Sequence, residues 1–157
     1  MAKRSAGILL YRTRLEKTDV LLVHPGGPFW QKKDLGAWSI PKGEDEDDED
    51  PLGAAKREME EEIGKKAEGE FIPLGHVKLK SGKMIHAWAC EGDFDPDNLE
   101  SNSFEMEWPP KSGQLKSFPE VDKAGWFDFA KAEEKINSGQ IPLLRELEKI
   151  ILSKKLL

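Results

Sequence analysis

Cysteine is nearly absent from this chain of 157 residues, and Cys90 alone cannot form an intramolecular disulfide. Histidine is scarce as well, with three residues, and no Cys or His spacing matches a zinc site. Apolar runs are short: the one near the N-terminus stops at Arg12, too early for a signal peptide, and none approaches the length that spans a bilayer. We therefore expect a protein of the reducing cytoplasm with no membrane partner.

The chain also lacks an excess of basic residues. It has 24 Lys and Arg against 30 Asp and Glu, which gives a formal net charge of −6 at pH 7. Such a charge offers no general attraction to nucleic-acid backbones, so we do not expect nucleic acid as a partner. A composition of 38% hydrophobic and 34% charged residues is ordinary for a globular protein. The length predicts a single domain over residues 1–157.

The most informative stretch runs from Gly43 to Lys65, where an acidic loop leads into a predicted helix. Asp50 suits the N-cap, Pro51 the first helical position and Gly64 the left-handed position after the end. Helical periodicity gathers two sets of side chains. The buried face comprises Leu52, Ala55, Met59 and Ile63, and the adjacent flank carries Glu58, Glu61 and Glu62.

Three carboxylates at this spacing repel one another and raise one another's pKa. A divalent cation would remove that cost, and an oxygen-only donor set suits Mg²⁺ or Mn²⁺. Arg57 lies one turn before Glu61, so an ion pair between them would orient a ligand carboxylate. The alternative is a merely solvated acidic face.

The spacing of this stretch resembles the signature of the Nudix hydrolase family. Gly43 is followed after five residues by Glu49, and after seven more by Arg57-Glu58-Met59-Glu60-Glu61-Glu62-Ile63-Gly64. The one departure is Lys65, where the family has an apolar residue, and it affects packing more than chemistry. Within the acidic loop only Glu49 holds a signature position; the other acidic residues are expected to be solvated.

The resemblance implies an α/β fold, an α/β/α sandwich around a mixed sheet. It implies a metal-dependent hydrolase in which activated water attacks phosphorus in a polyphosphate chain. The implied metal ligands are the Gly43 carbonyl and the side chains of Glu49, Glu58, Glu61 and Glu62. Arg57 joins them in the catalytic set, and Glu58 or Glu61 is the candidate general base. A further carboxylate outside the signature stays open among Glu105, Glu107 and Glu120.

The entrance Trp38-Ser39-Ile40-Pro41-Lys42-Gly43 is similar to that of family members acting on dinucleoside polyphosphates. Lys42 is a candidate phosphate ligand, against the alternative of a surface lysine, and Trp38 is a further candidate substrate contact. Nucleoside triphosphates, nucleotide sugars and ADP-ribose remain alternative substrates. A non-catalytic nucleotide-binding module is an alternative of another class. The oligomeric state is open.

Three more aromatic residues are candidate substrate contacts. Phe29 and Trp30 follow a Pro-Gly-Gly-Pro break and would form either loop packing or a base-stacking lip. His86 lies on an apolar strand and would be either a buried histidine or part of a pocket. The irregular stretch 92–114 is the expected carrier of specificity.

Periodicity predicts the remaining elements. Strands are expected at Ser5–Arg12, Asp19–His24, a short one at Trp38 and Ile40, a hairpin over 70–91, a half-buried strand at 104–108 and a strand at Trp126-Phe127, with helices at Phe129–Asn137 and Pro142–Leu156.

Overall fold

The computed structural model describes residues 4–45 and 48–155. Its main element is a six-stranded sheet in the order β4-β5-β1-β2-β8, with β3 also paired to β1. The strands are β1 (Arg4–Arg14), β2 (Lys17–Pro25), β3 (Lys42–Glu44), β4 (Phe71–Lys78), β5 (Met84–Glu91), β6 (Ser103–Glu107), β7 (Leu115–Pro119) and β8 (Val121–Asp128). The helices are α1 (Pro51–Ile63), α2 (Phe129–Lys135) and α3 (Ile141–Lys155), with short 3₁₀ turns at Pro96–Asn98 and Ser138–Gln140.

The sheet is mixed. β1 runs parallel to β5, whereas the β1–β2, β1–β3, β2–β8 and β4–β5 pairs are antiparallel. This confirms the predicted pairing of the first two strands and the predicted hairpin over 70–91.

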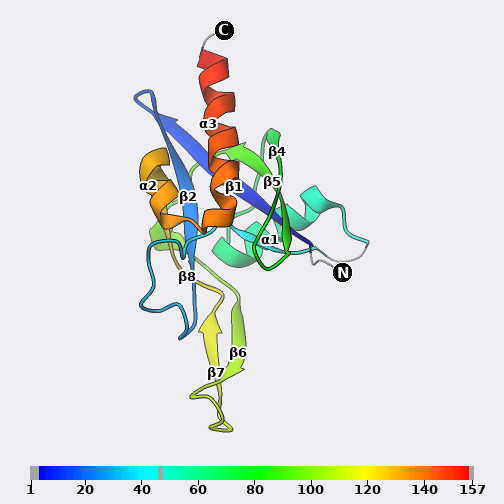
Figure 1. Cartoon of the computed structure of the whole chain (residues 1–157), viewed down its shortest axis with the longest axis vertical. Coiled ribbons are helices and arrows are strands. Elements are labelled where there is room, and N and C mark those ends of the chain that lie inside the picture. The colour runs from blue at the N-terminus through cyan, green and yellow to red at the C-terminus, as the bar shows by residue number, and fades with distance from the viewer. Residues whose placement is uncertain (1–3, 46–47, 156–157) are drawn as a thin grey trace.

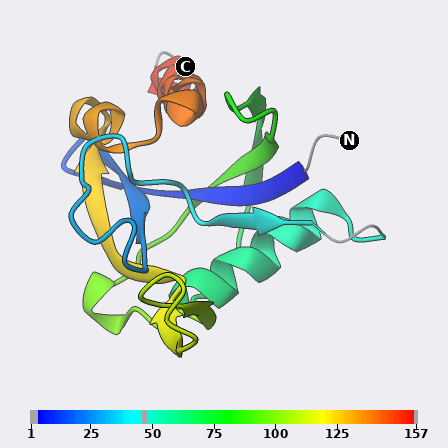
Figure 2. The ribbon, with the colours of Figure 1, turned by 60° about the horizontal axis from the view of Figure 1, so that its bottom comes forward.

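Helices cover both faces of the sheet, with α1 on one side and α2 and α3 on the other (Figure 2). Side chains alternate accordingly along β5, because successive residues of a strand point to opposite faces. Ile85, Ala87 and Ala89 join the core beneath α2 and α3, while Trp88 and Cys90 join the core beneath α1. The predicted α/β/α sandwich is therefore confirmed.

Helix α1 begins and ends as the sequence predicts. Asp50 accepts a hydrogen bond from the Gly53 N–H, and Gly64 adopts a left-handed conformation with φ of 81°. Met59 and Ile63 are fully buried against the sheet. The helix is thus fixed at both ends and along one face, which holds its acidic flank in place.

The segment at Trp38 and Ile40 corrects a prediction, because it forms no strand. Ser39 exchanges two backbone hydrogen bonds with Val23, and the Ile40 N–H donates to Gln140 Oε1 at 3.1 Å. One backbone bridge and one side-chain hydrogen bond thus take the place of a continuous row of strand-to-strand hydrogen bonds. The third strand starts only after Pro41, at Lys42.

Strands β6 and β7 form a separate two-stranded sheet that projects away from the main sheet (Figure 1). We call this sheet, together with its connecting turn 108–114, the arm. β6 has the predicted half-buried alternation, with Phe104 and Met106 partly buried. Its partner β7 was not predicted, because the sequence around it is rich in Pro, Gly and Ser. The arm begins at Ser103, so it takes up the second half of the stretch 92–114 that was expected to be irregular.

The C-terminal helices lie close to their predicted positions. α2 ends at Lys135, two residues earlier than expected, and α3 spans Ile141–Lys155, while Leu156 lies outside the described residues. Leu143, Leu144 and Leu147 are buried, as expected of a core-facing stripe. None of the helices in the described part of the chain has the length and apolar character needed to cross a membrane.

Candidate functional site

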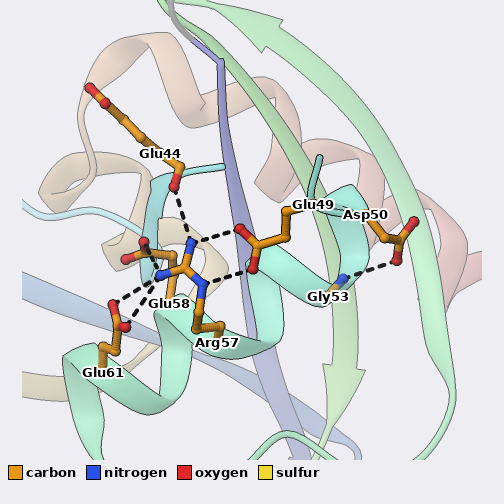
Figure 3. Close-up of polar contacts among 7 residues, drawn as sticks. All are labelled: Glu44, Glu49, Asp50, Gly53, Arg57, Glu58 and Glu61. Carbon is orange, nitrogen blue, oxygen red and sulfur yellow. Dashed lines mark hydrogen bonds and ion pairs between the residues drawn. The ribbon is translucent and has the colours of Figure 1, made fainter. Parts of the chain in front are cut away.

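Arg57 lies at the centre of the acidic flank of α1 and contacts several of its carboxylates (Figure 3). Its Nε and Nη2 donate to the two carboxylate oxygens of Glu49 at 2.7 and 2.8 Å. Its Nη1 donates to Glu58 at 2.9 Å and to Glu61 at 3.2 Å, so the predicted pair with Glu61 is present. These bonds, that to Glu49 first, raise the pKa of Arg57 above its usual range. One cation thereby links three signature carboxylates that would otherwise repel one another.

Gly43 and Glu58 approach each other closely. A Cβ atom at Gly43 would lie 1.9 Å from Oε2 of Glu58, a distance that no real contact allows. Gly43 pairs with Ala6 across the β1–β3 ladder, so its backbone is held by the sheet. The missing side chain therefore makes the space that Glu58 occupies.

Lys42 and Glu62 form the deepest part of the flank. The Lys42 N–H donates to Glu62 Oε1 at 3.1 Å. Burial raises the pKa of Glu62 to about 8, and burial followed by repulsion from Lys83 lowers the pKa of Lys42. Burial, followed by the charge of Glu61, also raises the pKa of Glu58. Such opposed shifts in neighbouring groups are common at functional sites.

These residues line a cavity of about 470 Å³, here called the carboxylate cavity. The predicted site residues that line it are Trp30, Lys42, Gly43, Glu58 and Glu62. Lys83, Phe104 and Glu120 line it too. Lys83 and Phe104 were not predicted, because they come from the β4–β5 turn and the arm and belong to no local motif.

Glu120 is the one of the three open carboxylates that reaches the cavity, whereas Glu105 and Glu107 are exposed on the arm. Its N–H donates to the Asn102 carbonyl at 2.8 Å, and its own carbonyl accepts from the Gly26 N–H at 2.9 Å. The Asn102 N–H in turn donates to the Glu61 carbonyl at 2.8 Å, so the base of the arm is tied to α1. Burial raises the pKa of Glu120.

The donor chemistry of this site fits a hard divalent cation. Its charged donors are carboxylates, and Gly43 leaves its backbone close to Glu58. Within residues 4–45 and 48–155, however, no three His, Cys, Asp or Glu side chains converge to hold an ion. Glu49, Glu58 and Glu61 are instead engaged by Arg57, and Glu62 by the backbone of Lys42. The residue types thus match a Mg²⁺ site whose ligands are held by hydrogen bonds.

Three predicted substrate contacts lie elsewhere. Trp38 is 5% exposed, its Nε1 donates to Asp34 at 2.8 Å and its ring packs on Phe127, so it is a core residue. Phe29 is 60% exposed and contacts Trp108 of the arm edge-on at 5.5 Å, outside the residues that line the carboxylate cavity. His86 lines a different cavity.

Comparisons with known proteins identify the family and the fold. A family model described as NUDIX domain matches residues 1–147. Among solved structures, an Ap4A hydrolase from C. elegans in a binary complex is similar with a TM-score of 0.69 and 19% identity, over 95% of this chain and 98% of that chain. The NUDIX domain of NrtR from Shewanella oneidensis, complexed with ADP ribose, has a TM-score of 0.64 and 14% identity, over 96% and 89% of the two chains.

A MutT protein from Methanosarcina mazei Go1 has a TM-score of 0.59 and 18% identity, over 94% of each chain. At these identities the solved structures establish the shared fold, and the family model, which covers most of the chain, establishes membership. The chain belongs to the Nudix hydrolase family.

Proposed function

We propose that this protein hydrolyses phosphoanhydride bonds of nucleoside diphosphates linked to another moiety, with dinucleoside polyphosphates as its substrate class. The observation that carries the proposal is the carboxylate cavity, where Lys42 meets Glu58, Glu62 and Glu120. The entrance sequence from Trp38 to Gly43 and the fold shared with an Ap4A hydrolase support the substrate class.

In this proposal the Gly43 carbonyl and the carboxylates of Glu49, Glu58, Glu61 and Glu62 hold Mg²⁺ or Mn²⁺. A divalent ion, when bound, neutralises phosphate oxygens and lowers the pKa of bound water. Arg57 holds the carboxylates of Glu49, Glu58 and Glu61 in position by hydrogen bonds. Its guanidinium donates to both oxygens of Glu49 in a bidentate arrangement.

The chain's own groups would bind the phosphates and accept the proton of the attacking water. Lys42 and Lys83 both line the cavity and supply positive charge for a polyphosphate. Glu58 has a raised pKa because it is partly buried beside Glu61, which suits a general base working near neutral pH. Trp30 lies at the same cavity with 39% of its surface exposed and offers an aromatic face to a base.

The test is phosphate release, measured with a coupled phosphatase and Mg²⁺. The panel contains dinucleoside polyphosphates, nucleoside triphosphates, nucleotide sugars and ADP-ribose. We expect metal-dependent turnover with preference for a dinucleoside polyphosphate, and at least a ~1000-fold loss of kcat in Glu62→Gln with the fold intact.

Glu60→Gln is the matched control, because Glu60 is exposed on the same helix and lines no part of the cavity. It should retain the wild-type rate. Near-normal turnover by Glu62→Gln would refute the site assignment. Absence of turnover on every compound, with nucleotide still bound, would instead indicate a binding module.

A further inference from the structure

A second cavity, of about 170 Å³, lies where strands β1, β4 and β5 meet the first residue of α1. We call it the histidine cavity. Its walls come from four strands or loops and one helix: Arg4 and Ser5 of β1, Asp45 after β3, Pro51 of α1, His76 of β4, and Met84 and His86 of β5. It shares no lining residue with the carboxylate cavity.

Two imidazoles dominate this cavity. His76 and His86 are cross-strand partners in the β4–β5 ladder, with ring centroids 6.2 Å apart in an edge-on arrangement. His86 also stacks on Trp88 at 4.2 Å, so Trp88 covers one face of its ring. The sequence alone could not separate a buried histidine from a pocket residue here. In the structure, one face of the His86 ring packs on Trp88, and His86 also lines the cavity.

Among the described residues, the buried Oγ of Ser5 has no hydrogen-bond partner, and Ser5 lines this cavity beside the two imidazoles. Burial, followed by the neighbouring His76, lowers the pKa of His86, which favours the neutral ring. A neutral imidazole presents one donor and one acceptor. A buried hydroxyl without a partner costs free energy, so Ser5 favours a ligand that forms hydrogen bonds, and the two imidazoles offer further donors and acceptors beside it.

The other walls narrow the class of ligand. Met84 and Pro51 are apolar, and a stacked aromatic pair favours a flat ring system. Arg4 and Asp45 bring opposite charges to the lining, so their formal charges cancel and neither sign of ligand charge is favoured overall. An uncharged, planar, hydrogen-bonding ligand fits this combination.

We propose that the histidine cavity binds a nucleobase, at a site separate from the carboxylate cavity. The choice of a nucleobase among planar heterocycles rests on the proposed function. The two cavities adjoin along the chain, because Glu44 and Lys83 line one and the next residues, Asp45 and Met84, line the other. A ligand with two bases, such as a dinucleoside polyphosphate, would then find a second aromatic site beyond Trp30.

The test is binding of adenosine, guanosine, cytidine and uridine by isothermal titration calorimetry in EDTA. Nucleosides carry no phosphate, so their binding needs neither metal nor turnover, and a failure here is distinguishable from a failure of the proposed hydrolysis. We expect one or more nucleosides to bind, and the affinity to fall at least ~10-fold in His86→Ala and in His76→Ala.

Lys78→Ala is the control, since Lys78 is exposed on the same strand as His76 and lines neither cavity. It should leave nucleoside affinity unchanged. His76 is exposed, so His76→Ala keeps the test valid if His86→Ala disturbs the stack on Trp88 and fails to fold. No binding at millimolar nucleoside, or binding kept in both histidine variants, would overturn the proposal.

Discussion

At the scale of single residues, Gly43 shows how a missing side chain can define a site. Its φ is not in the left-handed region, so backbone freedom does not explain it. The reason is contact: a methyl group would collide with both carboxylate oxygens of Glu58, at 1.9 and 2.5 Å. Glu58 lies on α1 and Gly43 on β3, so the glycine leaves the space beside the strand in which the Glu58 carboxylate lies.

We therefore expect Gly43→Ala to displace Glu58 and lower kcat by ~100-fold or more, because small misplacements of catalytic groups are costly. The measurement is steady-state hydrolysis of the best substrate, with melting temperature as the check on folding. Gly53→Ala is the control. Its Cβ would meet only ordinary contacts with Asp50 at 3.8 Å, so activity should be retained and stability raised by ~0.5–1 kcal/mol. Full activity in Gly43→Ala would contradict the contact argument.

Glu62 makes a second residue-scale prediction, on the pH dependence of stability without metal. Its pKa is raised to about 8 in the folded protein, against an ordinary value of 4.5. Between these two values the unfolded chain binds fewer protons than the folded one, so stability contributed by Glu62 is lost as pH rises. Glu62→Gln removes this loss.

In urea unfolding with EDTA, wild type should lose stability relative to Glu62→Gln between pH 6 and pH 9. We expect a change on the order of 1–2 kcal/mol, reduced from the full pKa shift because solvent screens a partly exposed carboxylate. Glu60→Gln is the control for the substitution itself, because Glu60 is exposed on the same helix. A pH-independent difference between wild type and Glu62→Gln would show that burial does not perturb the Glu62 carboxylate.

At the scale of elements, the arm of β6 and β7 is the part that most departs from the central sandwich. A two-stranded ribbon is marginally stable by itself in water. The hydrogen bonds of Glu120 and Asn102 hold its base. Its side chains also contact the loop after β2: Phe104 lies against Gly27, and Trp108 packs edge-on against Phe29. The arm thus supports the same loop that carries Trp30 to the cavity.

Shortening the arm tests this arrangement. Replacing residues 106–116 with Asn-Gly keeps the Glu105 and Ser117 pair as the closing pair of a tight hairpin. We expect kcat/KM to fall ~10-fold or more, since the loop loses its support from Trp108, while melting temperature changes by less than about 3 °C. Unchanged kcat/KM would remove the arm from substrate recognition, and a large drop in melting temperature would make it a folding element.

At the scale of the whole molecule, the two hydrophobic cores lie on opposite faces of the same sheet. Because they share its strands, we propose that residues 1–157 unfold as one domain. Cys90 is a probe of this. It is 1% exposed in the core beneath α1, its Sγ donates to the Glu68 carbonyl at 3.1 Å, and burial raises its pKa. Both effects suppress the reactive thiolate.

We expect the native protein to react with a disulfide reagent at least ~1000-fold more slowly than in 6 M urea, because the thiol is exposed only on unfolding. Across a urea titration, thiol exposure and loss of circular dichroism should have the same midpoint. The dichroism signal includes α3, which lies on the opposite face, so it serves as the independent probe. Two separated midpoints would contradict a single cooperative domain.

The sequence predicted the fold and the acidic flank well because their signals are local. Asp50, Gly64 and the spacing of Glu58, Glu61 and Glu62 act within a few residues of one another, and helical periodicity alone brings the carboxylates together. Arg57 and Glu61 likewise meet one turn apart. The same holds for the hairpin over 70–91, whose two arms are adjacent in the chain.

Only the tertiary structure decided what surrounds that flank. Glu120 rather than Glu105 or Glu107 reaches the cavity because Asn102 and Gly26 hold the base of the arm, contacts between segments far apart in sequence. Trp38 packs in the core and His86 in a separate cavity, although both have the residue type of a substrate contact. Which face a side chain meets depends on the segments packed against it, and composition and spacing carry no record of those partners.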